Sequence, residues 1–328
     1  MKKNILKISS LLLISIIFAC TNSSKNSEIK NSENEVGENE EIIEETMLNY
    51  DDFNIAFIMS SRLYLYDVKT DDLIDFDWET DTVFNCVFSD DNQILYYTVS
   101  KNSKLIIKKA DLSDTKPEIS ILAHLGKETQ EFVTETFGEK SPLYLYNNHL
   151  ILRCDFSWNE YGFTKFLEYS IENNTQKTLD FNQFAYKYGE YRESNEPNKD
   201  YNYIYKKTKE LDFSIYEPDA EVSDFYFGGV SKDESKIFFV AVLGWGDYPH
   251  GPYIISNIDG SKMKILENTD MATNDMKPIW YGNNLIYISY RFVDDYTKSQ
   301  QLRYTKADNN ESRFIAESVD YYAVKNSD

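Results

Sequence analysis

The chain is poor in the residues that build most catalytic and metal sites. Its 328 residues include only three cysteines and three histidines, which are His124, His149 and His250. No G-x-S-x-G elbow, H-E-x-x-H helix, C-x-x-C pair, P-loop or G-x-G-x-x-G turn occurs. The sequence therefore predicts no cofactor and no metal site. A structural role is expected for His124, at the start of a predicted helix, and for His149, which opens a predicted strand.

Basic residues are scarce as well. The 34 lysines and arginines stand against 55 acidic residues, which gives a formal net charge of −21. Such a field repels phosphate backbones, so nucleic-acid binding is not expected. The negative charge would favour the binding of metal cations or of basic partners. The alternative is that it serves only to keep the protein soluble.

Glycine (12) and proline (7) are far outnumbered by tyrosine (26) and phenylalanine (20). Aromatic residues favour strands, and this composition argues against global disorder. The length is sufficient for a large core, built either as one all-β domain or as two domains.

The N-terminus has the order of a secretory signal. Lys2, Lys3 and Lys7 precede an apolar run, Leu11–Ala19, which is too short for a comfortable membrane span and ends at Cys20. Residues 17–20 (IFAC) resemble the lipobox of bacterial lipoproteins, in which the peptide is cut before a cysteine that becomes acylated. The alternative is an ordinary signal peptide with an incidental cysteine.

The lipobox resemblance implies a lipid-anchored protein of the bacterial envelope that contacts the membrane through Cys20. Because Thr21 is not the aspartate that marks inner-membrane retention, the outer membrane is the favoured destination. We expect residues 1–19 to be the signal peptide, residues 20–51 an acylated cysteine and flexible acidic tether, and residues 52–328 the folded domain.

The folded part repeats a four-stranded pattern. Residues 222–266 contain four predicted strands separated by a polar turn, a long aromatic loop and an Asp259-Gly260 turn. Similar units recur at spacings of about 40–60 residues, as the blades of a β-propeller do. The predicted fold is therefore an all-β propeller of four-stranded blades.

Two turns carry a more specific resemblance. Residues 88–96 (FSDDNQILY) and 230–239 (VSKDESKIFF) resemble an element of TolB-like, or WD40-like, propellers, and residues 257–261 (NIDGS) resemble that family's next turn. The resemblance covers residues 52–328 as a repeat pattern. We expect six blades, the usual number for that family, with Phe181–Glu221 as one of them; the alternative is five blades, with that segment as an insertion.

The two ends of the domain predict how the propeller closes. The first unit lacks its first strand, because Phe53–Met59 matches a second strand. Residues 319–327 match the first strand and turn of the central repeat. We therefore expect the C-terminal strand to complete the first blade and remove its open edges.

Candidate sites follow from loop length. Long loops between second and third strands lie on one face of a propeller, where binding usually occurs. Three such loops combine aromatic and acidic residues, which suit sugars, Ca²⁺ or basic partners; the alternative is that the rings only pack the loops against each other. The predicted binding residues are Trp158, Glu160, Tyr161, Trp245, Asp247, Tyr248, Asp294, Asp295 and Tyr296.

Two further residue pairs are candidates for special roles. Asp224 and Asp320 occupy matching first-strand positions near the expected channel mouth, where they are either turn residues or catalytic acids. Cys86 and Cys154 fall on different strands of neighbouring units, which favours two buried thiols over a disulfide.

These features predict a membrane-anchored propeller that binds an unknown protein or glycan without catalysis. One alternative is a glycan-active enzyme that uses carboxylates at the channel mouth. Another is a structural subunit of an envelope assembly, which would expose a broad apolar patch.

Acylation at Cys20 is the first testable expectation. Cys20→Ser should move the protein from the detergent phase into the soluble fraction, because the anchoring acyl chains would be absent. Metabolic labelling with palmitate measures the modification directly. Unchanged labelling in the variant would show that the lipid is attached elsewhere.

Overall fold

In the computed structural model the chain divides into two units, Met1–Thr46 and Met47–Asp328. All described residues belong to the second unit, and among them no helix is long and apolar enough to cross a bilayer. The structure describes residues 48–102, 104–125, 143–153, 165–188, 202–208, 210–212, 222–243, 252–266, 278–292, 298–305 and 312–326.

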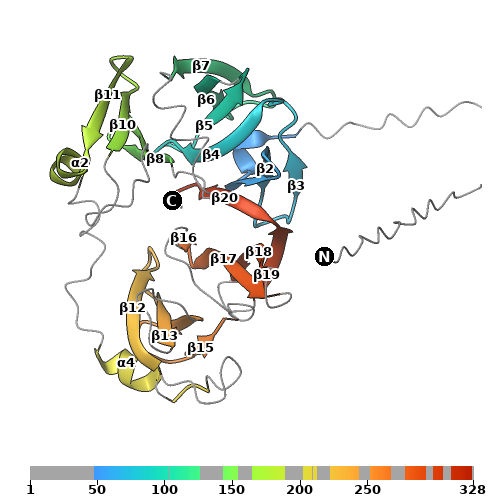
Figure 1. Ribbon diagram of the computed structural model, residues 1–328. Helices are drawn as coiled ribbons and strands as arrows, with labels where there is room; N and C mark the ends of the chain where they lie inside the picture. Colours follow the sequence, from blue (N-terminus) through green and yellow to red (C-terminus); the bar gives the residue numbers. More distant parts are fainter. Residues whose placement is uncertain are drawn as a thin grey trace, which may run out of the picture. The chain divides into compact units, whose positions relative to one another are not determined.

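These residues form five antiparallel four-stranded sheets, each a blade of the predicted β-propeller (Figure 1). Blade 1 contains β20 (Val319–Val324), β1 (Ile55–Met59), β2 (Arg62–Tyr66) and β3 (Leu73–Asp75). Blade 2 contains β4 (Thr82–Phe88), β5 (Ile94–Lys101), β6 (Lys104–Asp111) and β7 (Glu118–His124). His124 thus ends a strand and does not begin a helix; the rest of that expected helix lies outside the described residues.

The remaining blades repeat the same order. Blade 3 contains β8 (Leu143–Tyr146), β9 (His149–Arg153), β10 (Lys165–Ser170) and β11 (Thr175–Asp180). Blade 4 contains β12 (Val222–Val230), β13 (Lys236–Leu243), β14 (Tyr253–Asn257) and β15 (Lys264–Ile265). Blade 5 contains β16 (Ile279–Tyr281), β17 (Asn284–Phe292), β18 (Lys298–Thr305) and β19 (Ser312–Glu317).

The described residues form five blades, the alternative count, and not the six that the sequence favoured. The difference lies in Phe181–Glu221, whose described part forms two helices, α2 (Phe181–Tyr188) and α4 (Asn202–Thr208), and no strand. The described residues therefore support an insertion between blades 3 and 4 rather than a sixth blade.

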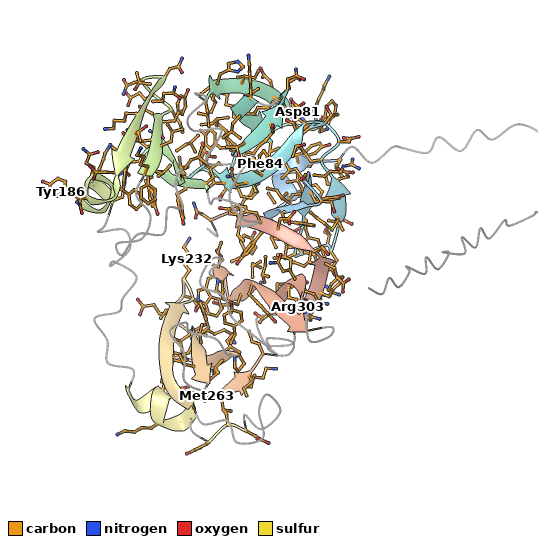
Figure 2. All side chains as sticks on the ribbon, in the orientation of Figure 1. Asp81, Phe84, Tyr186, Lys232, Met263 and Arg303 are labelled. Carbon is orange, nitrogen blue, oxygen red and sulfur yellow. The ribbon has the colours of Figure 1, made fainter. Side chains whose placement is uncertain are left out.

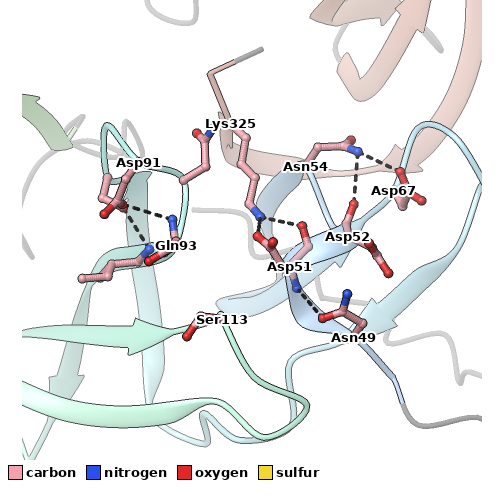
Figure 3. Close-up of polar contacts among 12 residues, drawn as sticks. Asn49, Asp51, Asp52, Asn54, Asp67, Asp91, Gln93, Ser113 and Lys325 are labelled. Atoms are coloured by element: carbon pink, nitrogen blue, oxygen red, sulfur yellow. Dashed lines mark hydrogen bonds and ion pairs between the residues drawn. The ribbon is translucent and has the colours of Figure 1, made fainter. Parts of the chain in front are cut away.

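The predicted closure of blade 1 is confirmed. The red C-terminal strand β20 lies beside β1 in the blue blade, with Tyr322 opposite Phe57 (Figure 1). Beyond the strand, the buried Lys325 ammonium donates to the Asp51 carboxylate at 2.9 Å and to the Asp51 carbonyl at 2.7 Å (Figure 3). Asp51 belongs to a short 3-10 turn, η1 (Tyr50–Asp52), just before β1. The two ends of the folded unit are thus joined by both a sheet and an ion pair.

Each blade buries both of its faces, because alternate side chains of a strand point to opposite sides. In β5, Leu95 and Tyr97 lie in a cluster with residues of blade 1, whereas Tyr96 lies in a cluster with blade 3. In β17, Ile286 faces blade 1 and Leu285 faces blade 4. Shared cores therefore join blades 3 and 2, 2 and 1, 1 and 5, and 5 and 4.

The turns that resemble the TolB-like element share one hydrogen-bond pattern. Ser89 Oγ donates to Asp91 at 2.5 Å, and Ser231 Oγ donates to Asp233 at 2.8 Å. Each serine Oγ also accepts the backbone N–H five residues later, at 2.9 Å in both turns. This pattern explains why serine and aspartate recur two residues apart in otherwise divergent repeats.

In both turns the third residue after the serine has a left-handed backbone, a conformation that favours glycine. Asn92 has φ of 63° and Glu234 has φ of 54°. Asn92 also donates to the carbonyl of Asn326 and accepts from its N–H, both at 2.7 Å, so this turn binds the C-terminal tail. In the two turns the Ser89 and Ser231 amides also donate to the carbonyls five residues later. The Lys325 amide, at the matching position after β20, donates instead to the Asn54 carbonyl at 2.9 Å.

Substitution of Asn92 tests its bonds to the C-terminal tail. Asn92→Gly should lower stability, since the two bonds to Asn326 are lost and outweigh the relief of left-handed strain. Asn92→Ala loses the same bonds and keeps the strain, so it should lower stability by about 1 kcal/mol more. Urea unfolding measures both effects. A glycine variant as stable as the wild type would contradict the contribution assigned to the bonds with Asn326.

Candidate binding surface

The three aromatic and acidic loops join equivalent strands. They connect β9 to β10 in blade 3, β13 to β14 in blade 4, and β17 to β18 in blade 5. Each joins the second strand of its blade to the third, as predicted, so all three arise at the equivalent end of their sheets. The loop residues themselves, all nine predicted binding residues among them, lie outside the described part of the chain, as Cys20 does.

The strands that support these loops are firmly placed. In blade 4 the Ala241 amide donates to the Pro252 carbonyl at 3.1 Å, which closes the base of the loop. The next residue, Tyr253, is buried and meets Tyr287 of blade 5 edge-on, with ring centroids 5.5 Å apart. In blade 5 the pairing of β17 with β18 continues to the last residue of β17. These two loops therefore begin and end on paired strands.

The equivalent connections of blades 1 and 2 are short. Met59 pairs with Arg62 across Ser60 and Ser61, whose φ angles of 51° and 64° are those of a tight hairpin turn. In blade 2, β5 and β6 are likewise joined by a connection of two residues. Long loops of this type are therefore confined to blades 3, 4 and 5, an asymmetry that the propeller fold alone does not require.

The two aspartates at matching first-strand positions lie in matching strands. Asp320 is half-buried in β20 of blade 1. Asp224 lies in β12 of blade 4, where it pairs with Val242, and its side chain is not among those described. The two residues belong to blades that share no cluster of described residues, so the expected role of the pair stays a prediction.

The structure places His149 and Cys86 among the histidine and cysteine candidates. His149 places Nδ1 2.8 Å from the Asn147 carbonyl, a contact within its own turn. Cys86 is a free thiol, fully buried, and burial raises the pKa of its thiol. Its possible partner Cys154 lies outside the described residues, so the expectation of two separate thiols stays a prediction.

One pair of carboxylates converges at a place that the sequence did not suggest. Glu79 and Asp81 follow β3 in the connection to blade 2, and both bind the buried Lys108 of β6. The Lys108 ammonium lies 2.8 Å from each carboxylate, and the Tyr97 hydroxyl donates to Glu79 at 2.9 Å. The signal in the sequence was Lys108, which pairs with Tyr97 in the middle of blade 2. A lysine buried there requires an acidic partner for its ammonium group.

Asp81 in this network is an ion-pair partner of Lys108 and lacks the raised pKa of an acid catalyst. A glycosidase general acid needs a raised pKa. Hydrogen bonds from Lys108 instead lower the pKa of Asp81. Burial alone would lower the pKa of Lys108, but hydrogen bonds to Asp81 and Glu79 raise it. The Asp81 and Lys108 charges are therefore fixed in their ionised forms, and the network joins the blade connection to the sheet.

Comparison with known proteins gives matches to solved structures at low identity. No family model and no curated protein matches the chain. TolB from Acinetobacter baumannii is 10% identical, with a TM-score of 0.41, over 83% of this chain and 66% of that one. A chain of the nidogen/laminin complex is 7% identical, with a TM-score of 0.32, over 83% and 97%. The AtxE2 isopeptidase in its apo form is 11% identical, with a TM-score of 0.33, over 77% and 46%.

The chain thus spans slightly less than two thirds of the TolB structure. At these identities and scores the likeness adds no argument about a ligand or a reaction. The assignment as a β-propeller follows from the order and pairing of the strands described above.

Lys108→Met should cost about 3 to 5 kcal/mol of unfolding free energy, because it leaves the Glu79 carboxylate buried without its cation. Adding Glu79→Gln should recover much of this loss. The matched control is Lys101→Met, which removes an exposed partner of Asp81 and should cost less than about 1 kcal/mol. Equal losses for the two lysines in urea titrations would show that the buried network contributes little.

Proposed function

We propose that this protein is a non-catalytic binding module tethered to a membrane of the bacterial envelope. One observation supports the proposal above all. Long loops between second and third strands occur in blades 3, 4 and 5 alone, and all three loops combine aromatic and acidic residues. A loop needed only to connect two strands can be two residues long, as blades 1 and 2 demonstrate. The extra length is better explained by a ligand than by folding.

The loop composition suits a glycan or a basic protein surface. Trp158 and Trp245 offer large apolar faces that can stack on sugar rings or fill a pocket of a protein partner. The carboxylates of Glu160, Asp247 and Asp294 can accept hydrogen bonds from sugar hydroxyls or pair with lysine and arginine. The negative net charge would also speed encounter with a basic partner.

Anchoring through Cys20 completes the proposal, with the outer membrane as the favoured site. Residues 21–47 then separate the lipid from the folded unit, whose described part begins at Leu48. Such a tether would let the propeller search for a ligand near the membrane surface, and its acidic composition favours an extended chain.

Substitution of the tryptophans tests the proposed surface. Lipidated wild-type protein, Trp158→Ala and Trp245→Ala would be compared on a glycan array and in capture of detergent-solubilised envelope proteins. Loss of a true anchor should weaken binding by about 2 kcal/mol, or about thirtyfold, with little change in melting temperature.

The matched control is Lys232→Ala, in the exposed turn that joins β12 to β13 on the opposite face. It should bind as the wild type does. If all three variants retain wild-type binding, the site lies elsewhere, and the Phe181–Glu221 segment becomes the first alternative.

A further inference from the structure

Three large apolar side chains are exposed near the junction of blades 1 and 2. Trp78, in the connection between the two blades, is 43% exposed, and Ile121, on the outer strand of blade 2, is 52% exposed. Leu48, the first residue that the structure describes, is 39% exposed. Isolated apolar residues on a surface need no explanation, whereas a group of them marks a candidate contact surface.

Trp78 is held in place at the start of the folded chain. Its indole N–H donates to the Tyr50 hydroxyl at 2.7 Å. Tyr50 is itself buried against Phe76, with the two rings edge-on at 6.0 Å, and it follows Leu48 by two residues. The Lys116 ammonium lies 5.5 Å from the centroid of the Trp78 ring. The indole therefore has a fixed orientation beside the point where the chain enters the folded unit.

Ile121 faces the blade connection that contains Trp78. It pairs with Lys108, and paired residues of antiparallel strands point to the same face of a sheet. The Lys108 ammonium lies 2.8 Å from Glu79, the residue after Trp78. Lys108 also binds Asp81 of the same connection, which is labelled in Figure 2. The buried network thus brings the apolar residues to one area, the entry patch, which consists of Leu48, Trp78, Lys116 and Ile121.

The proposed membrane anchor places the entry patch on the side of the folded unit nearest to the lipid. Between Cys20 and Leu48 the chain has 27 residues, 21–47. A flexible chain of that length spans about 30 Å on average, whereas a compact domain of about 280 residues is roughly 50 Å across. The tether is therefore shorter on average than the domain that it carries. The surface around Leu48 consequently meets the membrane more often than the far side of the domain does.

The composition of the entry patch suits a membrane surface. Tryptophan places its apolar ring at the boundary between headgroups and acyl chains, and a lysine stem can lie along apolar surface with its ammonium among the phosphates. Asp52 and Asp77, which are close to Tyr50 and Trp78 in the chain, are exposed, so the charges at this place are mixed. Mixed charge favours a zwitterionic lipid surface over an anionic one.

We propose that the entry patch contacts the bilayer, with Trp78 among zwitterionic headgroups and upper acyl chains and with Leu48 and Ile121 beside it. This contact rests on the proposed anchoring through Cys20. It goes beyond that anchoring because a tether alone assigns no particular face of the propeller to the membrane.

Fluorescence quenching by brominated lipid tests the contact. The mature chain, residues 20–328 with Cys154→Ser, would be coupled through Cys20 to a maleimide lipid in phosphatidylcholine vesicles; Cys86 is completely buried and stays. Bromine atoms near the headgroup end of the acyl chains quench only tryptophans that touch the lipid. Quenching should be at least about twofold stronger in this parent protein than in its Trp78→Phe variant, because Trp78 lies at the bilayer surface.

The matched pair of variants is Ile121→Glu and Leu73→Glu, which place the same charge on two outer strands. Leu73 is 47% exposed and pairs with Tyr66, on the face of blade 1 that packs on blade 5. Ile121→Glu should remove at least about half of the Trp78 quenching, since a carboxylate enters lipid only at high cost. Leu73→Glu should leave the quenching unchanged, and melting temperatures check that each variant folds.

Three results would overturn the proposed contact: equal quenching in the parent and Trp78→Phe, no effect of Ile121→Glu, or the same loss in both glutamate variants. Because the lipid is attached chemically, these results do not depend on whether cells acylate Cys20. Absence of palmitate labelling would refute the proposed anchor, whereas absence of Trp78 quenching refutes the contact alone.

Discussion

The pairing of β20 with β1 is the contact on which the fold depends. It joins residues 319–324 to residues 55–59 and supplies blade 1 with the first strand that the N-terminal part of the chain lacks. Blade 1 in turn packs on both blade 2 and blade 5, so the two halves of the chain meet through it. The buried Lys325 adds an ion pair to Asp51 at the same place, just before the first strand of the folded unit.

Polar contacts at the edges of the blades support this arrangement without replacing the apolar core. Asp233 accepts from Asn283 of blade 5 at 2.7 Å, and Asp71 of blade 1 accepts from Tyr304 of blade 5 at 2.9 Å. Hydrogen bonds, the first of them from Tyr66, lower the pKa of Asp71 and keep it ionised. Such contacts set the register between neighbouring blades, while the alternating apolar residues provide most of the stabilisation.

Much of the fold was predictable because strands and tight turns leave local signals. The four-stranded unit predicted for residues 222–266 is blade 4, and the match of residues 319–327 to a first strand and turn predicted the closure. The helices of Phe181–Glu221 were not predicted. Short helices gain their stability from tertiary contacts, here Phe184 on Phe166 and Ile204 within blade 4, which a tyrosine-rich sequence does not reveal. The Lys108 network was missed because only the folded sheet brings Lys108 of β6 to Glu79 and Asp81, which precede it by more than 25 residues.

Removal of the C-terminal strand tests the central claim most directly. Deletion of Val319–Asp328 should expose the edge of β1 and the apolar residues that Val319 and Tyr322 cover, and we expect aggregation or a large drop in melting temperature. Deletion of Ser327–Asp328 alone is the matched control and should melt as the full-length protein does. A chain without β20 that melts like this control would contradict closure through the C-terminal strand.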